Sequence, residues 1–230
     1  MSNVLLFIQE NNTKMASVSR IELVHAQIAL FVAIILQFVT LRISNDLLPS
    51  SQYMLIVGEL ILSALLGFTH SLHKTRLKTI HHVVATLVLG LISIANITAL
   101  FSVLTSLVVG HVSADGPQLL ASALAIFGTN IIVFSLWYWE IDSPGLTGKR
   151  WSKHDKDFQF TQQDLPREYP NWRPEFLDYF FLSVISAINF APADTRPLTR
   201  QAKMLMAAQS LISVFTLALV LARSVSVLGP

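Results

Sequence analysis

Residues 175–200 read EFLDYFFLSVISAINFAPADTRPLTR, a short apolar segment that runs into a polar turn with two prolines. We name this stretch the elbow segment. A helix needs roughly 20 apolar residues to cross a bilayer, because each residue adds only about 1.5 Å. The apolar part, 175–191, is shorter than that, and a long apolar run at 203–227 follows the turn. We therefore predict that 175–191 either crosses as a short helix or enters the membrane and returns.

The composition places the whole chain in a lipid bilayer. Of its 230 residues, 53% are hydrophobic and only 13% are charged, which is more apolar surface than one soluble core can hold. The sequence has no Cys, which excludes disulfides and thiolate-based metal or redox centres. The net charge of +2 comes from Lys and Arg in a few connecting segments rather than from a basic patch. Nucleic acid is therefore not an expected partner.

Apolar runs of membrane-crossing length divide the chain, at 23–42, 53–69, 80–109, 119–139 and 203–227. The connections between the first four runs are short, which favours an up-and-down bundle. We predict an all-α polytopic integral membrane helical bundle, with five or six transmembrane helices and a short or re-entrant helix before the last one. The predicted regions are an N-terminal cytoplasmic segment (1–22), a four-helix transmembrane bundle (23–139), a polar loop (140–174), and a pore-like helix, elbow and final transmembrane helix (175–230).

The polar loop at 140–174 carries four prolines and mixed charge, and we predict that it is extended and has no core. Its carboxylates, such as Asp155, Asp157 and Asp164, are interpreted as solvated charge. Directly before the loop, the aromatic run 137–139 is typical of a helix end at the membrane–water interface.

The positions of Lys and Arg indicate the orientation, because basic residues accumulate in cytoplasmic connections. With a cytoplasmic N-terminus and six crossings, 12 of the 16 Lys and Arg residues fall on the cytoplasmic side. If 175–191 re-enters from the cytoplasm instead, 14 of them do, so both arrangements satisfy the rule. The expected location is the cell (inner) membrane, which the chain crosses several times.

One carboxylate, that of Glu59, lies well inside an apolar run. A charge at that depth costs several kcal/mol unless it is protonated, paired or hydrated. Reflecting the chain about the connection at 43–52 puts Gln37 near the same depth. Two interpretations stay open. Glu59 is an ion or proton site, or it is neutral and holds two helices together through a hydrogen bond to Gln37.

The remaining polar residues indicate packing rather than chemistry. Imidazoles cluster around one basic connection, at His70, His73, His81 and His82. No carboxylate or thiol nearby completes a ligand set, so we predict no metal site. Three amides inside apolar runs are expected to form hydrogen bonds between helices, those of Asn96, Asn130 and Gln209. No catalytic motif is present, and we predict no catalytic residue, no cofactor and no enzymatic activity.

Three stretches carry a resemblance to a known family. They are WYWEID at 137–142, DYFFLSVISAINFAPADTRPLT at 178–199 and AKMLMAAQSLISVFTLALVLARSVSVL at 202–228. Together they resemble an uncharacterised bacterial family of small integral membrane proteins. More distantly, the elbow segment is similar to the pore module of potassium channels, in which a short helix, a filter strand and a D-x-x-P-x-T elbow precede an inner helix. Asp194, Pro197 and Thr199 match that elbow.

The filter departs from the potassium-channel pattern. Those channels use T-V-G-Y-G, whose glycines let every backbone carbonyl point at the ion. Here the same register reads NFAPA, from Asn189 and Phe190 to Ala193, so both glycines are replaced by Ala. The resemblance therefore implies a pore without a potassium-type filter, in a homo-oligomer that passes monovalent cations. In that pore Asp178, Asn189 and Asp194 would face the symmetry axis.

A rival interpretation needs no pore. Pro192 and Pro197 end a short helix, Asp194 and Thr195 form the turn, and Thr199 caps the next helix. The chain would then be a non-conducting membrane scaffold or an accessory subunit.

Overall fold

The computed structural model describes residues 20–44, 48, 50–71, 77–109, 116–142, 156–170, 172–189 and 194–228, with the backbone alone at 20, 66–71, 77–82, 107–109, 116 and 222–228. Its elements are α2 (Arg20–Ile43), α3 (Ser51–Ser71), α4 (Leu77–Val109), α5 (Gly116–Asp142), β1 (Phe158–Phe160), α6 (Thr161–Asp164), α7 (Phe176–Asn189), β2 (Thr195–Pro197) and α8 (Arg200–Leu228). Each of the five predicted apolar runs forms a helix, so the helical bundle is confirmed.

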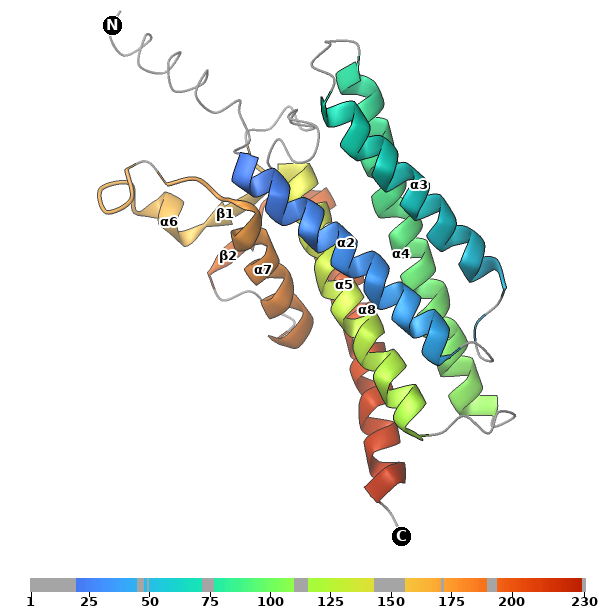
Figure 1. Ribbon diagram of the computed structural model, residues 1–230. Helices are drawn as coiled ribbons and strands as arrows, with labels where there is room; N and C mark the ends of the chain where they lie inside the picture. Colours follow the sequence, from blue (N-terminus) through green and yellow to red (C-terminus); the bar gives the residue numbers. More distant parts are fainter. Residues whose placement is uncertain are drawn as a thin grey trace, which may run out of the picture.

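The long helices α2, α3, α4 and α5 run alternately in opposite directions (Figure 1). We call the end of the bundle at Asp142 and Arg200 the strand end, and the end at Ile43 and Val109 the far end. Four helical stretches in the described part are long and apolar enough to cross a membrane, which indicates a membrane protein. They are Ile21–Ile43, Val83–Ser106, Pro117–Asp142 and Arg200–Leu221.

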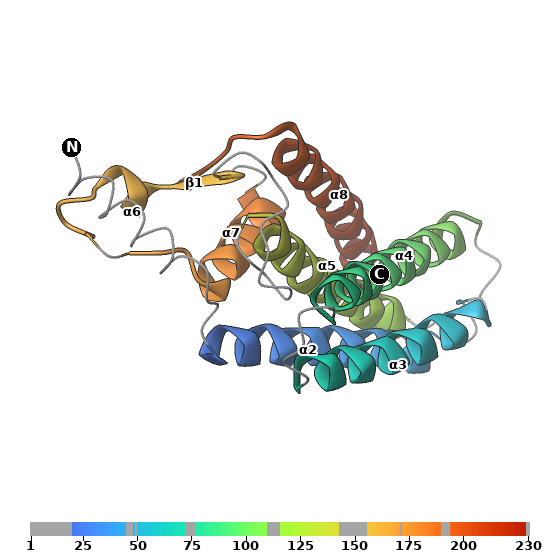
Figure 2. The same cartoon turned by 90° about the horizontal axis from the view of Figure 1, so that it is seen from above.

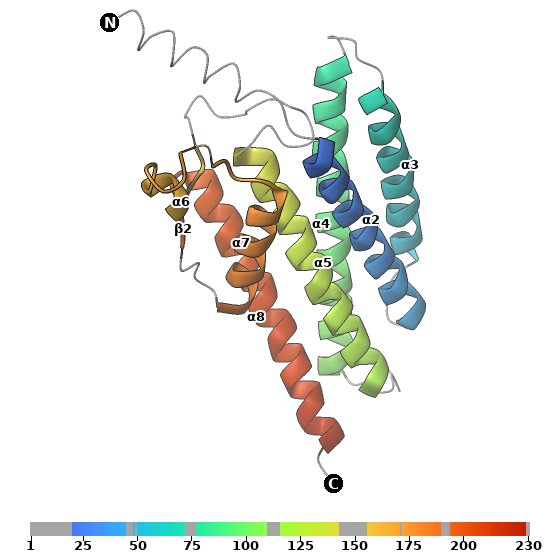
Figure 3. The same ribbon diagram turned by 60° about the vertical axis from the view of Figure 1, so that its left-hand side comes forward.

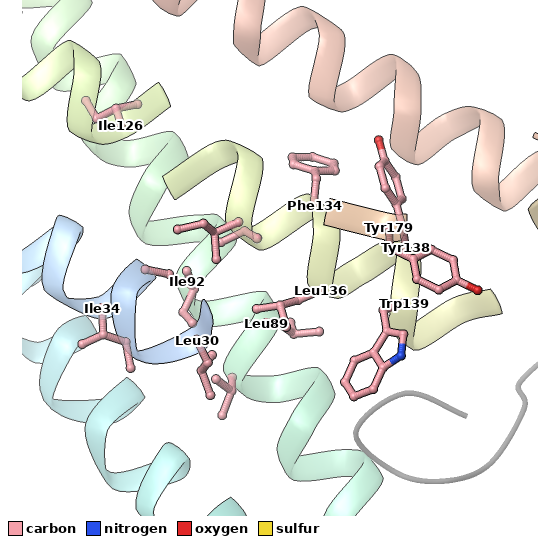
Figure 4. Close-up of a cluster of buried hydrophobic side chains, with 14 of the residues drawn as sticks. Leu30, Ile34, Leu89, Ile92, Ile126, Phe134, Leu136, Tyr138, Trp139 and Tyr179 are labelled. Carbon is pink, nitrogen blue, oxygen red and sulfur yellow. The ribbon is translucent and has the colours of Figure 1, made fainter. Parts of the chain in front are cut away.

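Helix α5 lies at the centre of the bundle, with α2, α4, α7 and α8 around it (Figure 2). Buried Leu30 of α2, Leu89 and Ile92 of α4 and Leu136 of α5 gather between these helices (Figure 4). Gly128 lets α2 come close to α5, since a Cβ at Gly128 would stand only 3.3 Å from a methyl group of Leu36. The apolar core is therefore built around the one helix that contacts most of the others.

Helix α7 starts at the strand end, runs into the bundle beside α5 and stops before the far end (Figure 3). The chain then comes back to the strand end as β2, where α8 begins. The start of α7 is fixed by the Asp178 carboxylate, which accepts a hydrogen bond of 2.7 Å from the backbone N–H of Glu175. The start of α8 is fixed by Thr199, whose hydroxyl oxygen accepts the N–H of Ala202 at 3.2 Å. The predicted cap at Thr199 is confirmed.

The strands β1 and β2 join segments that are far apart in sequence. They pair in antiparallel register, with Phe158 opposite Pro197 and Phe160 opposite Thr195. Both Phe side chains are buried, whereas Gln159 between them is partly exposed, as expected for a strand with one face on a core. The bundle is therefore not entirely helical.

Aromatic rings hold β1 against the helices. The Phe158 ring lies 5.2 Å from the Tyr138 ring of α5, and the Phe160 ring lies 5.4 Å from the Tyr179 ring of α7, both edge to face. The prediction that 140–174 has no core is therefore wrong for its described part. In the predicted interfacial aromatic run, Tyr138 and Trp139 are fully buried and pack on protein side chains, and the level of the run in a membrane stays a prediction. Hydropathy alone does not show that Tyr138 packs on Phe158 of the loop and Trp139 on Phe176 of α7.

Candidate functional site

A buried carboxylate at the strand end connects three elements. Asp142 is the last residue of α5, and its Oδ2 accepts a hydrogen bond of 2.6 Å from the Tyr179 hydroxyl of α7. Its Oδ1 accepts the backbone N–H groups of Asp157 and, at 3.0 Å, of Phe158. One side chain thus fixes α5, α7 and β1 relative to one another.

A second carboxylate extends this junction to α8. Asp157 is buried, and its Oδ1 accepts a hydrogen bond from the Thr199 hydroxyl, while its carbonyl oxygen accepts the N–H of Leu198 at 2.8 Å. The interpretation of Asp157 as solvated charge is therefore wrong. Asp164, in contrast, is exposed, and Asp155 lies outside the described residues.

Deeper in the bundle, hydrogen bonds link α5, α7 and α8. The Tyr138 hydroxyl donates to Oε1 of Gln209. The Gln209 amide nitrogen donates to the carbonyl and hydroxyl oxygens of Ser183, at 2.9 and 2.7 Å. The Ser183 hydroxyl in turn donates to the carbonyl oxygen of Ile131 at 2.6 Å. Every side chain of this layer is fully buried.

Near the middle of α5 the row of polar groups ends in an amide. The Asn130 nitrogen donates to the Ser213 hydroxyl of α8 at 3.0 Å. Its Oδ1 is buried and has no hydrogen-bond partner among the described residues. Asn130 lies twelve residues before Asp142, or about 18 Å along the helix. We name this row the polar seam: Asp142, Tyr179, Tyr138, Gln209, Ser183, Asn130 and Ser213.

The charged groups of the elbow segment lie outside the polar seam. Asp178, at the start of α7, is half-buried. Burial raises the pKa of its carboxyl, the hydrogen bond from the Glu175 backbone lowers it, and the negative charges of Glu175 and Asp194 raise it further, so the balance is upward.

Asp194 and Thr195, two further predicted site residues of the elbow segment, form hydrogen bonds within the chain. The Asp194 carbonyl oxygen accepts two hydrogen bonds from Thr161, one from its N–H at 3.2 Å and one from its hydroxyl at 2.6 Å. Thr195 and Pro197 form β2, and the Thr195 hydroxyl donates to Oδ1 of Asp194 at 3.3 Å. Asn189 is exposed at the end of α7. Phe190 and Pro192 lie outside the described residues.

The two intramembrane polar residues named from the sequence are both buried. Gln37 donates to the carbonyl oxygen of Ile92 in α4 at 2.9 Å, and Glu59 is 0% exposed. No hydrogen bond joins Glu59 to Gln37 among the described residues, since both Glu59 oxygens and Gln37 Oε1 have no partner there. For the imidazole cluster, His73 lies outside the described residues, and the side chains of the other three are not described.

Sequence reasoning found part of the polar seam. The predicted interhelical hydrogen bonds of Asn130 and Gln209 are confirmed, whereas for buried Asn96 the bond stays a prediction. The junction around Asp142 and Tyr179 was missed. A signal was present for Tyr179 alone, because Tyr179, Ser183 and Ser186 follow one another at helical spacing and so share one face of α7.

Comparison with other proteins adds no further constraint. No family model, curated protein or solved structure matches the chain.

Proposed function

We propose that the chain is a multi-pass membrane protein with five crossings, α2, α3, α4, α5 and α8, and one re-entrant segment, α7 with β2. Helix α7 has 14 residues, about 21 Å of helix, which is short of the roughly 30 Å hydrocarbon layer. With this arrangement, all Lys and Arg residues except Arg42 and Arg223 belong to the strand end by sequence. That bias favours a cytoplasmic strand end and N-terminus, in the cell membrane.

The placement can be tested with single Cys variants, because the natural chain has no Cys that would need removal. Tyr169→Cys at the strand end and Gln118→Cys at the far end both replace exposed side chains. A membrane-impermeant maleimide added to intact cells should label Gln118→Cys only. Labelling of Tyr169→Cys from outside would contradict the proposed orientation.

The function that we propose is passage of monovalent cations along the polar seam. The observation that carries it is the row of buried hydrogen-bonding groups from Asp142 to Asn130, between α5, α7 and α8. It has one carboxylate at its cytoplasmic mouth and an unpartnered amide oxygen at its deep end. Carboxylate, carbonyl and hydroxyl oxygens are the groups that replace the water of a hard cation.

The re-entrant helix supports the same assignment. The hydrogen bond from Ser183 to Ile131 places the second half of α7 near the middle of α5. The C-terminal end of α7 therefore lies beyond the level of Ile131 along the bundle, away from the strand end, and the partial negative charge at that end favours a cation at this level. Broken or half-length helices at such depth are typical of ion and substrate sites in transport proteins.

The path fits inside one chain better than on an axis between chains. The polar residues of α8, Gln209 and Ser213, are turned towards α5 and α7. The opposite face of α8 exposes apolar side chains, Met204, Leu211 and Phe215. An oligomer with α8 at its axis would therefore present an apolar pore, so the homo-oligomer stays a prediction to be tested by mass measurement in lipid nanodiscs.

Cation flux into proteoliposomes tests the proposal. Gln209→Met removes the hydrogen bonds at the centre of the seam with little change in volume, and Gln201→Met changes an exposed residue of the same helix as the matched control. Wild type and Gln201→Met should pass a monovalent cation above the level of protein-free vesicles. The cation flux through Gln209→Met should be at least about tenfold lower than that of wild type. The reason is that loss of one contact that stabilises the cation by about 1.4 kcal/mol lowers a rate tenfold. Equal flux in both variants would contradict the proposal.

A non-conducting scaffold or accessory subunit is the second candidate. One observation favours it, namely that Asp178, Asp194 and Thr199 are all engaged in hydrogen bonds that cap helices or connect segments of the chain. In that case the polar seam only holds helices together. Gln209→Met would then lower the melting temperature, and neither it nor wild type would show any flux above empty vesicles.

A further inference from the structure

A second buried polar site lies on α3, away from the polar seam. The face of α3 that packs on α4 carries Gln52, Ile56, Glu59 and Ser63, at helical spacing. Gln52 is satisfied, since its amide nitrogen donates to the Thr98 hydroxyl at 2.6 Å. Glu59 is 0% exposed, and neither carboxyl oxygen has a hydrogen-bond partner in the described part of the chain. This carboxyl group is therefore buried without a described partner for either of its oxygen atoms.

Another unpartnered oxygen atom belongs to Gln37, which contacts α4 close to the place where α3 does beside Glu59. Gln37 bonds to α4 at Ile92 through its nitrogen, and its Oε1 has no partner among the described residues. Gly58, the neighbour of Glu59, lies beside Leu91 of α4, one residue from Ile92. Glu59 and Gln37 therefore lie near consecutive residues of α4, Leu91 and Ile92.

One turn after Glu59, the Ser63 hydroxyl also lacks a partner among the described residues. Glu59, Gln37 and Ser63 together supply four oxygen atoms without a described hydrogen-bond partner. Amide and carboxylate oxygens only accept hydrogen bonds, and the Ser63 hydroxyl supplies a single donor, so the group has more acceptors than donors and carries no positive charge.

No charged side chain in the described part compensates Glu59. On α2, the titratable groups are Arg20, whose side chain is not described, Glu22 and His25 near its start, and Arg42 near its end, where Arg42 lies over the Phe38 ring. On α4, residues 83–106 contain no titratable side chain.

On α5, the central helix, the titratable side chains are Tyr138, Glu140 and Asp142, all at the strand end. On α3 itself, the described side chains include one other titratable group, the exposed Tyr53. An ionised Glu59 would therefore be isolated within an apolar surrounding, at a large cost in free energy.

We propose that Glu59, with Gln37 Oε1 and the Ser63 hydroxyl, forms an exchangeable site for one monovalent positive charge between α2, α3 and α4, supplied by a proton or by an alkali-metal cation. A single positive charge neutralises the single carboxylate, whereas a divalent ion would leave a net charge inside the bilayer. Oxygen ligands suit both sources, because a protonated carboxyl donates to an amide oxygen and an alkali cation binds to oxygen atoms. The site rests on the proposed membrane placement but not on conduction through the polar seam.

The experiment measures how a hydrophobic carbodiimide labels Glu59 of the full chain in nanodiscs, read by mass spectrometry. This reagent reacts with protonated carboxyl groups. If a proton is the ligand, labelling falls about tenfold per pH unit above the midpoint and is unaffected by Na⁺ or K⁺. If an alkali cation is the ligand, adding Na⁺ or K⁺ to a choline buffer at fixed pH lowers the labelling. Glu59→Gln, which has no carboxyl group at this position, is the control for labelling at Glu59.

Melting temperatures provide an independent readout that does not require reagent access. Glu59→Gln keeps the shape of the side chain but cannot exchange a charge, so its melting temperature should lose the dependence on pH or alkali cation that wild type shows. The proposal is overturned if Glu59→Gln follows the wild-type profile under all these conditions, and also if Glu59 labelling does not respond to pH or salt. Failure of the cation-flux test would leave both of these readouts unchanged, and the Cys labelling tests the membrane placement separately.

Discussion

The hydrogen bond between Tyr179 and Asp142 carries a prediction that tests the junction at the strand end. Tyr179→Phe removes the hydroxyl that donates to Asp142 Oδ2 at 2.6 Å and leaves the ring contacts in place. A hydrogen bond to a charged group stabilises by about 1.5–3 kcal/mol in soluble proteins. Side-chain hydrogen bonds within membrane proteins average only about 0.6 kcal/mol, with a maximum near 1.7. Because both partners are buried and one is a carboxylate, we expect a loss of about 1.5 kcal/mol.

A double-mutant cycle separates this bond from other effects of each change. Asp142→Asn keeps an oxygen for the N–H groups of Asp157 and Phe158, but it removes the charge that strengthens the bond from Tyr179. Reversible unfolding of the four proteins in mixed micelles should give a coupling energy of about 1 kcal/mol between Asp142 and Tyr179. Tyr169→Phe, at an exposed position, should change the free energy of unfolding by less than about 0.5 kcal/mol. Additivity of Asp142→Asn and Tyr179→Phe within about 0.3 kcal/mol would refute the contact.

Three more predictions concern other parts of the fold. The raised pKa of Asp178 means that the native state keeps its proton longer than the unfolded state, so stability falls as pH rises above 3.8. In Asp178→Asn, the melting temperature should decrease less with rising pH than in wild type. An unchanged dependence on pH would contradict the raised pKa of Asp178. Gly90→Ala should raise the free energy of unfolding by up to about 1 kcal/mol through helix propensity, since a Cβ at this position meets nothing within 4 Å. Gly128→Ala should raise it by less, because the Leu36 side chain must move. Phe158→Ala should cost about 3 kcal/mol in denaturant unfolding, and a loss under 1 kcal/mol would show that β1 is not part of the core.

Local hydropathy determined the coarse fold. The bilayer thickness sets the length of a crossing, so the runs that became α2, α3, α4, α5 and α8 could be located from the sequence. The early stop of the elbow segment and the cap at Thr199 were also visible, because helix length and capping depend on neighbouring residues. The amides of Asn130 and Gln209 could be recognised as interhelical contacts, since a polar group inside an apolar run needs a partner.

The candidate sites depend on contacts that hydropathy does not encode. Glu59 and Gln37 were named from their depth, but only the structure shows that each has unpartnered oxygen atoms instead of a bond between them. Asp157 looked like one of several loop charges, and only its contact with Thr199, 42 residues later, shows that it is buried. A helix-end carboxylate such as Asp142 is ordinarily solvated, so its role could not be predicted without its partners.

The sequence by itself therefore determined that this is a membrane protein with long apolar helices and a short one before the last. Only the tertiary structure shows that the chain returns, after that short helix, to the end of the bundle where the helix begins, because the apolar pattern of the helix does not specify where the next segment goes. The deciding contacts are non-local: β1 pairs with β2, and the Tyr179 hydroxyl reaches Asp142. These contacts hold the end of β2 and the start of α8 at the end of the bundle where α7 begins. The physical reason is that hydrogen-bond partners are chosen by proximity in space, which no local pattern of apolar residues specifies.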